Sequence, residues 1–199
     1  MAAGTREQFL DSAEVLFAER GFYGVSIAAI ASELGLTKQA LLHHFGSKEK
    51  LYGEVLRRIS DQFESMEPGP DPSPADAGHH LKTYLLDIAQ TALQSPDRTR
   101  LLMRELLDNK HRAERAGTWY LKPFLERLIG MVRAIPAWRE AGDADALALV
   151  YQLLGAINYF GVSKPTLLGI FGSDAYADLD EAFPQRLGRL IDIAISSPD

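Results

Sequence analysis

The sequence predicts an all-α protein in two helical parts: an N-terminal three-helix helix-turn-helix domain and a C-terminal helical bundle. Apolar residues recur at helical spacing along the 199-residue chain, and no stretch alternates apolar and polar residues long enough for a strand. No Asn-Gly or Asp-Gly pair joins two β-branched runs, so no hairpin is indicated. Helices without a sheet bury their apolar faces against one another, which makes a bundle.

The composition is that of an ordinary soluble globular protein, with 46% hydrophobic and 24% charged residues. The chain contains no cysteine, which excludes disulfides and thiolate metal sites and agrees with a cytoplasmic protein. Its first residues lack the apolar core of a signal peptide. The apolar segment Ala146–Val162 is shorter than the ~20 residues of a membrane-spanning helix and contains Gln152 and Asn158. We therefore expect a buried helix there and no contact with a membrane.

The formal net charge of −6 is unfavourable for binding nucleic acid, but the acidic residues are unevenly distributed. Residues 1–60 carry seven Lys/Arg and seven Asp/Glu, whereas the remaining chain carries fourteen basic and twenty acidic residues. Because an acidic surface repels phosphates, we expect the C-terminal part to point away from any nucleic acid and a local patch to supply the attraction.

The first helix is expected from about Arg6 to Arg20. Thr5 and Gln8 have the spacing of a capping box, and Gly21 stands where a left-handed residue commonly ends a helix. The apolar stripe of this helix consists of Phe9, Leu10, Ala13, Leu16 and Phe17. This stripe is expected to close the core of the helices that follow.

Residues 26–45 predict two short helices joined by a tight turn. Ser26 and Thr37 are suitable N-caps, and Gly35 suits the turn because glycine adopts a positive φ at little cost. Each cap is flanked by apolar residues at the spacing of a hydrophobic staple, which are Val25 with Ile30 and Leu36 with Leu41. The expected core consists of Ile27, Ile30, Leu34, Leu36, Leu41 and Phe45. Two helices that cross at ~90–120° around such a core form a helix-turn-helix.

The second of these helices leaves a face outside the core, as a DNA-recognition helix does. This face consists of Lys38, Gln39, Ala40, Leu42 and His43. In a major groove, Lys38 suits guanine or a phosphate, Gln39 suits adenine, and Ala40 suits a thymine methyl group. The side chains placed to hold phosphates are Ser26, Thr37, His44 and Lys48.

Other interpretations of these residues stay open. A helix pair with a glycine turn also occurs as an interior corner of many all-α proteins, without DNA. The adjacent His43 and His44 point in different directions on a helix, so no metal site is expected. Arg57 and Arg58 are interpreted as a solvated face. No phosphate loop, G-x-S-x-G, H-E-x-x-H or carboxylate cluster with ligand spacing is present, so we predict no enzyme, no catalytic residue and no cofactor.

Residues 5 to about 58 resemble the DNA-binding domain of the TetR family of transcriptional regulators. The resemblance is carried by Leu16-Phe17-Ala18-Glu19-Arg20-Gly21-Phe22, Ile30-Ala31, Leu34-Gly35-Leu36-Thr37-Lys38, Leu41-Leu42-His43-His44-Phe45 and Lys48-Glu49-Lys50-Leu51-Tyr52. It implies a homodimer whose recognition helices enter successive major grooves, with phosphate contacts from Ser26, Thr37, His44 and Lys48. Family members usually carry a phosphate-binding tyrosine at the position of Leu42, and leucine cannot make that contact.

A proline-dense loop at residues 68–74 is the clearest boundary in the chain. We place a DNA-binding domain at residues 1–62 and a C-terminal domain for effector binding and dimerisation at residues 63–199. A fourth helix is expected from after Ser47 to about Ser65, and later helices at residues 79–94, 97–110, 113–134, 143–164 and 175–196. Pro165 is expected to end the long apolar helix, and Pro184 to split or kink the last one.

The middle helices are rich in aromatic and sulfur-containing side chains, which suits a cavity for a small apolar or aromatic effector. The candidate ligand-binding residues are Met103, Arg104, His111, Trp119, Tyr120, Phe124, Tyr151, Gln152, Asn158 and Tyr159. The alternative is that most of them are plain core. The last two long helices are expected to form a four-helix dimer interface.

These observations together predict a homodimeric, sequence-specific regulator that binds double-stranded DNA at a palindromic operator. We favour a repressor that a small-molecule inducer releases from DNA, with a tilt of the fourth helix changing the spacing of the recognition helices. An inducer acts by preferring a conformation with the wrong spacing of the recognition helices, which must lie ~34 Å apart. The alternatives are an activator on the same fold and a helical interaction module without specific DNA binding.

Overall fold

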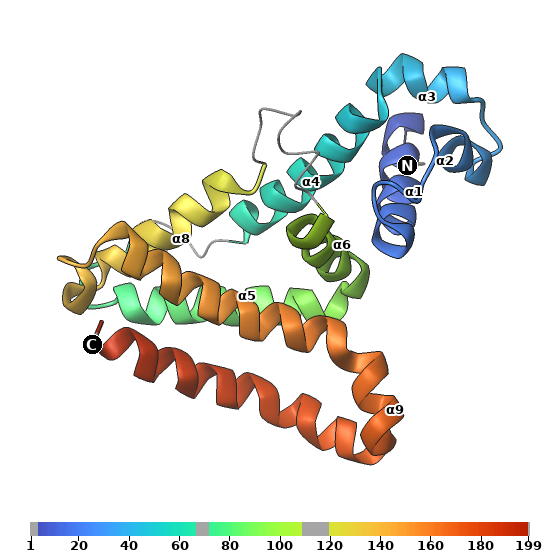
Figure 1. Cartoon of the computed structure of the whole chain (residues 1–199). Helices are drawn as coiled ribbons and strands as arrows, with labels where there is room; N and C mark the ends of the chain where they lie inside the picture. Colours follow the sequence, from blue (N-terminus) through green and yellow to red (C-terminus); the bar gives the residue numbers. More distant parts are fainter. Residues whose placement is uncertain (1–3, 67–71, 109–119, 199) are drawn as a thin grey trace. The chain divides into compact units, whose positions relative to one another are not determined.

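The computed structural model describes residues 4–66, 72–108 and 120–198, and within these residues it contains helices and no strand (Figure 1). The elements are α1 (Thr5–Arg20), α2 (Ile27–Glu33), α3 (Lys38–Phe45), α4 (Lys48–Ser65), α5 (Ala77–Gln94), α6 (Pro96–Asp108), α8 (Lys122–Ala134), the 3₁₀ turn η1 (Pro136–Trp138) and α9 (Asp143–Ser196). The predicted all-α fold class, with an N-terminal helix-turn-helix and a C-terminal bundle, is confirmed.

The helices form two compact units. The first contains the described residues up to Gln62 together with those from Asp97 to Leu121, and the second contains the rest. The sequence-based division put everything after residue 62 into one C-terminal domain. In the structure, α6 instead belongs with the helix-turn-helix, because its charged side chains pair with α1 and α4.

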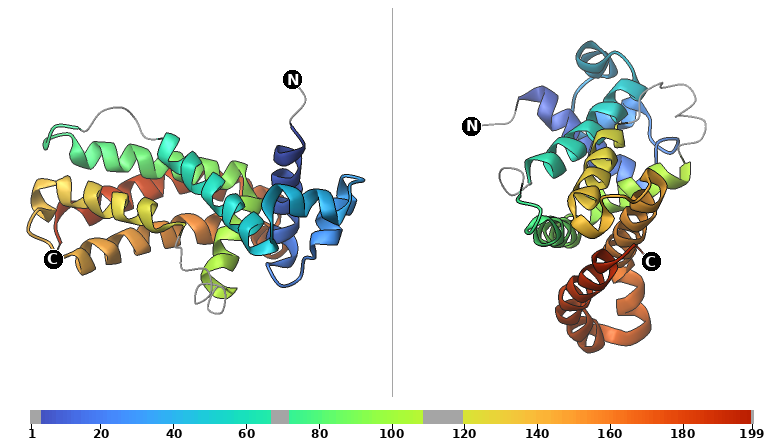
Figure 2. Two further views of the ribbon diagram at one scale, coloured as in Figure 1. Left: turned by 90° about the horizontal axis from the view of Figure 1, so that it is seen from above. Right: turned by 90° about the vertical axis from the view of Figure 1, so that its left-hand side faces the viewer.

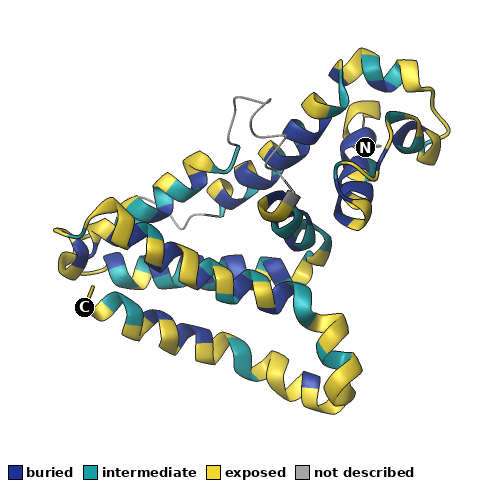
Figure 3. Ribbon diagram, in the orientation of Figure 1, coloured by how far each residue is buried: buried dark blue, intermediate teal, exposed yellow. Residues whose placement is uncertain are grey.

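The core of the first unit forms where α1 meets the helix-turn-helix. The apolar stripe of α1 is buried along its whole length, as predicted (Figure 3). Phe9 meets Phe45 of α3 edge to face, with ring centroids 6.3 Å apart. Ile30 and Leu41 are fully buried. Leu36, which we expected in this core, is 37% exposed because it lies in the turn between α2 and α3, off the helix faces that meet.

Short-range capping defines where the short helices begin. The Ala29 amide donates to Ser26 Oγ at 3.0 Å, and the Ala40 amide donates to Thr37 Oγ1 at 3.2 Å, as predicted. The capping box expected at the start of α1 does not form. Thr5 is already helical, and the Gln8 amide donates to the Gly4 carbonyl at 3.1 Å.

In the second unit, α5, α8 and α9 pack against one another around an apolar core. Tyr84 of α5 is fully buried, and its hydroxyl donates to the Phe63 carbonyl at 2.8 Å. Phe63 in turn stacks on Phe124 of α8 at 5.0 Å. Trp138 Nε1 donates to the Ile195 carbonyl at 3.1 Å, which holds the end of α9 to η1.

The two long C-terminal helices that we predicted are the two halves of α9, which are joined at a kink and return side by side (Figure 1, Figure 2). Pro165 and Pro184 both lie inside it, and the non-helical residue is Gly172, with φ 83° and ψ 173°. Pro165 therefore does not end the helix. The break falls at Gly172 because only glycine adopts this backbone conformation without strain. Phe160 and Phe183 stack across the two halves at 3.8 Å.

By length and composition alone, α9 contains an 18-residue stretch apolar enough to cross a membrane, and 39% of that stretch is buried in this structure. The core helix of a soluble protein satisfies the same criterion.

Candidate nucleic-acid interface

The recognition helix α3 presents a polar face to solvent. Lys38, Gln39 and His43 are exposed, and Ala40 and Leu42 are half-buried. The intervening residues Leu41 and Phe45 point into the core, so the five residues expected to meet bases lie together on the outer side of the helix. Their contacts with DNA stay a prediction.

Three helix starts near this face carry hydroxyl caps. Besides Ser26 and Thr37, Ser47 caps α4, and its Oγ accepts from the Lys50 amide at 3.2 Å. Free amides in the first turn of a helix attract anions, and hydroxyl groups add donors. These starts therefore form a surface suited to phosphate oxygens.

Two of the four predicted phosphate ligands, His44 and Lys48, lie against aromatic rings. The exposed His44 ring lies against Phe9 with centroids 5.8 Å apart. Lys48 is half-buried, with Nζ over the Phe22 ring at 4.3 Å from its centroid. Burial lowers the pKa of Lys48 from its ordinary value, and the charge of Glu49 opposes this shift. Phe22, which directly follows the glycine that ends α1, belongs to a motif of the family resemblance, but no site role was predicted for it.

Positive charge on this surface is confined to a few lysines, which agrees with the local patch expected for a protein of net negative charge. Among the described residues, Lys38, Lys48 and Lys50 form no ion pair. Arg6 and Arg57, by contrast, both pair with Glu54. The available cations therefore lie on α3 and at the start of α4.

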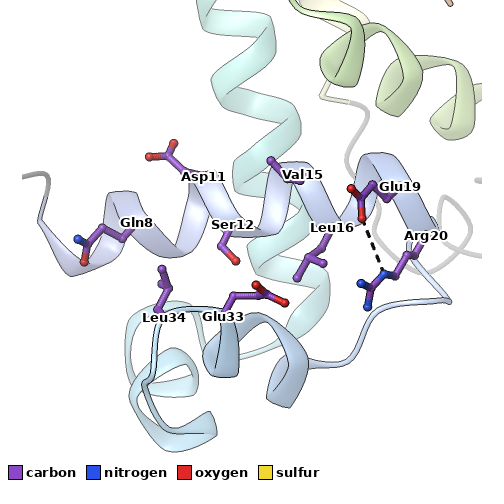
Figure 4. A pocket seen from close by; sticks show the side chains of 9 residues that line it. All are labelled: Gln8, Asp11, Ser12, Val15, Leu16, Glu19, Arg20, Glu33 and Leu34. Carbon is purple, nitrogen blue, oxygen red and sulfur yellow. Dashed lines mark ion pairs between the residues drawn. The ribbon is translucent and has the colours of Figure 1, made fainter. Parts of the chain in front are cut away.

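A groove of about 590 Å³ lies between α1 and α2 (Figure 4). Its lining includes the carboxylates of Asp11, Glu19 and Glu33, and Arg20 within it pairs with Glu19 at 3.9 Å. Carboxylates repel phosphates, so this groove is not part of the candidate interface.

Part-buried ion pairs join α1, α4 and α6. Glu14 of α1, with only 11% of its side chain exposed, binds both Arg58 of α4 and Arg98 of α6, the latter at 2.6 Å. Arg58 also donates to Asp11 at 2.6 Å. Burial alone lowers the pKa of Arg58, but its hydrogen bonds with Glu14 and Asp11 raise it above the ordinary value. The solvated face expected at Arg57 and Arg58 is therefore wrong for Arg58.

Two further residues of α6 bind the N-terminal helices. Arg104 donates to the carbonyls of Ala18 and Glu19 at 2.9 Å each, where α1 ends and its dipole attracts a cation. Tyr52 of α4 donates to the buried carboxylate of Glu105 at 2.9 Å. This anchoring role was not predicted from the sequence, where its only signal was the density of charged residues in α6.

The candidate ligand-binding residues that the structure describes are divided between the two units. Met103, Arg104 and Tyr120 belong to the first unit, and Arg104 is engaged with α1. Phe124 is buried core, Asn158 is half-buried, and Tyr151, Gln152 and Tyr159 are exposed. His111 and Trp119 lie outside the described residues.

Two cavities in the second unit are lined by other side chains. One of about 480 Å³ lies between α5 and α8, beside His80, Arg127 and Met131. Another of about 620 Å³ lies between α5 and the second half of α9. Neither is lined by a residue that we predicted, so the effector site stays a prediction.

Comparison with known proteins shows what this arrangement is similar to. Residues 9–55 match the family model described as "Bacterial regulatory proteins, tetR family". The chain is 26% identical over 181 residues to the transcriptional repressor NicS of Pseudomonas putida, covering 87% of this chain and 83% of NicS. It is 42% identical over 61 residues to the repressor KstR2 of Rhodococcus jostii, a match that spans 31% of this chain and 30% of KstR2.

A solved structure supports the fold over the whole length. The transcriptional regulator SCO4942 of Streptomyces coelicolor superposes with a TM-score of 0.67 at 18% identity, covering 95% of this chain and 97% of that protein. At this identity the likeness concerns the fold alone.

Proposed function

We propose that this chain, which belongs to the TetR family of helix-turn-helix transcriptional regulators, is a dimeric repressor that a small-molecule inducer releases from a palindromic operator. The observation that carries the proposal is the exposed polar face of α3, bordered by three hydroxyl-capped helix starts. Such a surface suits a major groove and its phosphates. Two relatives, NicS at 26% identity over 181 residues and KstR2 at 42% identity over 61 residues, are named as repressors.

In this function, α3 enters the major groove with its N-terminal end towards the bases. Lys38, Gln39 and Ala40 contact base edges, and His43 and Leu42 border them. Leu42 contributes an apolar contact in place of a hydroxyl donor. Phosphates are held by Ser26, Thr37, His44 and Lys48, which fix the register but carry no sequence information themselves.

Dimerisation is supported by the apolar surface of α9. Tyr159 and Ile193 are 73% and 72% exposed in the single chain, and Tyr151 and Leu190 are 49% and 46% exposed. Soluble monomers rarely expose many large apolar side chains on one element. A second copy of α9 covers them in the proposed dimer, as a self-complementary two-fold interface.

Regulation requires that the inducer favour one conformation over another. The fourth helix, α4, belongs to the first unit up to Gln62 and continues into the second. It therefore transmits a conformational change in the second unit to the first. We propose that the inducer binds the second unit and alters the spacing of the two recognition helices. The protein then acts in the cytoplasm, where a bacterial chromosome lies.

Selection from a pool of random duplexes at two salt concentrations tests this function. We expect an enriched palindrome with half-sites about one helical turn apart. Retention without an enriched sequence would leave only non-specific binding, and no retention would indicate an interaction module. The position of the operator relative to a promoter then distinguishes a repressor from an activator.

A further inference from the structure

Lys48 occupies an electrostatically unfavourable position. It is the first residue of α4, at the positive end of an 18-residue helix, where a cation is disfavoured. Its ammonium group is partly withdrawn from water, and burial lowers its pKa. No carboxylate among the described residues forms an ion pair with it. A cation kept in such a place needs a specific stabilising contact.

Phe22 supplies that contact. The Lys48 Nζ lies 4.3 Å from the centroid of the Phe22 ring, within the range of a cation–π interaction. The ring is itself fixed, because it meets Tyr52 at 5.1 Å and 72°, and stacks on Phe17 at 6.1 Å and 25°. Phe17 is fully buried and Tyr52 is 2% exposed. The aromatic platform therefore connects the ammonium group to the core of the unit.

Lys48 also stands at a helix start that offers other donors. Lys48 follows the cap residue Ser47, whose hydroxyl accepts from the Lys50 amide, and it opens the first turn of α4 with its free amides. An ammonium group has three N–H donors, and a cation–π contact with one ring does not use all of them. An incoming anion meets a cation whose side-chain entropy has already been partly lost.

We propose that Phe22 is a positioning residue for DNA binding, which holds the Lys48 ammonium group ready for a phosphate at the start of α4. The inference rests on the proposed function, in which Lys48 binds a phosphate. It assigns to the aromatic residue after Gly21 a role beyond packing. Without the ring, Lys48 swings into solvent and must be ordered again during each binding event.

A double-mutant cycle tests the inference. We would measure the affinity of Phe22→Leu, Lys48→Met and the double variant for a duplex of mixed sequence across a range of salt concentrations. Phe22→Leu is expected to weaken binding several-fold and to lower the slope of log affinity against log salt by part of the ~0.9 that one phosphate contact contributes. In the Lys48→Met background it is expected to have no further effect.

Lys50 provides a matched control. It lies on the same helix, is exposed and has no ring contact among the described residues, so the effect of Phe22→Leu should be unchanged in a Lys50→Met background. Phe22→Tyr and Phe22→Trp keep an aromatic face and should restore the wild-type slope. Thermal unfolding of each variant shows whether the fold is retained.

The outcomes separate the two proposals. A Phe22→Leu effect of equal size in the wild-type and Lys48→Met backgrounds would show a packing role and overturn the inference. An unchanged salt slope in Phe22→Leu would overturn it as well. If the wild-type chain binds duplexes without preferring any sequence, the proposed operator recognition fails, while the cycle still reports whether Phe22 acts through Lys48.

Discussion

The two units of this protein are stabilised by different means. In the first, buried charges join helices that are distant in sequence, with Glu14 between Arg58 and Arg98. In the second, the helices meet through apolar side chains, and α9 still exposes large ones such as Tyr159 and Ile193. The first unit therefore relies on charge pairing between helices distant in sequence, whereas the packing of the second is apolar and leaves large side chains of α9 exposed.

This difference has a physical reason. Buried ion pairs are costly to desolvate and demand a particular geometry, so they specify arrangement more than they add stability. Apolar contact is non-directional and accommodates a second copy of the same surface. A unit that must present a recognition helix accurately gains from the first kind of contact. A unit that dimerises, as we propose for the second unit, gains from the second.

The largest expected effect concerns the exposed side of α9. Replacing Ile193 by Asp should raise the dimer dissociation constant by about 100-fold or more, because a charge would be buried in the proposed interface. Sedimentation velocity over a range of concentrations measures this. Val15→Asp, at a residue of α1 that is 44% exposed, is the matched control and should leave the oligomeric state unchanged. A dimer that survives Ile193→Asp would place the interface elsewhere.

Next in size is the charged junction of the first unit. Glu14→Ala leaves Arg58 and Arg98 without their shared carboxylate and should reduce the free energy of unfolding by about 3 kcal/mol. Urea denaturation measures the loss. Glu19→Ala, which removes a half-exposed carboxylate, should cost less than about 0.5 kcal/mol. Equal losses for the two variants would contradict a special role for the junction.

Substitutions on the exposed face of α3 are expected to change the affinity for DNA but not the stability of the fold. Lys38→Ala should weaken operator binding by about 1–3 kcal/mol if Lys38 reads a base, or lower the salt slope by about 0.9 if it holds a phosphate. Titrations at several salt concentrations distinguish these contacts. Because Lys38 is exposed and forms no ion pair with the described residues, its removal should not change the unfolding midpoint. Unchanged affinity would remove Lys38 from the interface.

The smallest effect is a pH dependence in the second unit. Burial, together with the charge of Glu64, raises the pKa of Tyr84 from 10.0 to about 12. Since the folded protein holds this proton more tightly than the unfolded chain, the stabilisation is fully present below pH 10 and is lost as the pH rises towards 12. Tyr84→Phe should remove this part of the alkaline loss.

At neutral pH, Tyr84→Phe should cost about 1 kcal/mol, because the hydrogen bond to the Phe63 carbonyl disappears. Urea unfolding of both proteins at about pH 8 and about pH 11.5 measures the two effects together. If the wild-type and variant proteins lose stability equally between these pH values, the Tyr84 proton is not linked to folding.

Much of the candidate interface was predictable from sequence. The caps at Ser26 and Thr37 and the turn at Gly35 depend on residues a few positions apart, and the structure has all three. The outward face of α3 follows from the helical period. What could not be predicted were contacts across long separations, such as Arg104 with Ala18 or Lys48 with Phe22.

The sequence by itself determined the all-α class, the helix-turn-helix and its exposed polar face, because each depends on spacing within one or two helical turns. Only the tertiary structure decided that α6 belongs to the first unit, that Arg58 is paired rather than solvated, and that α9 breaks at Gly172 rather than at Pro165. These features depend on which partner each side chain or turn meets. These partners are determined when helices distant in sequence pack together, because the arrangement of lowest free energy depends on the whole chain.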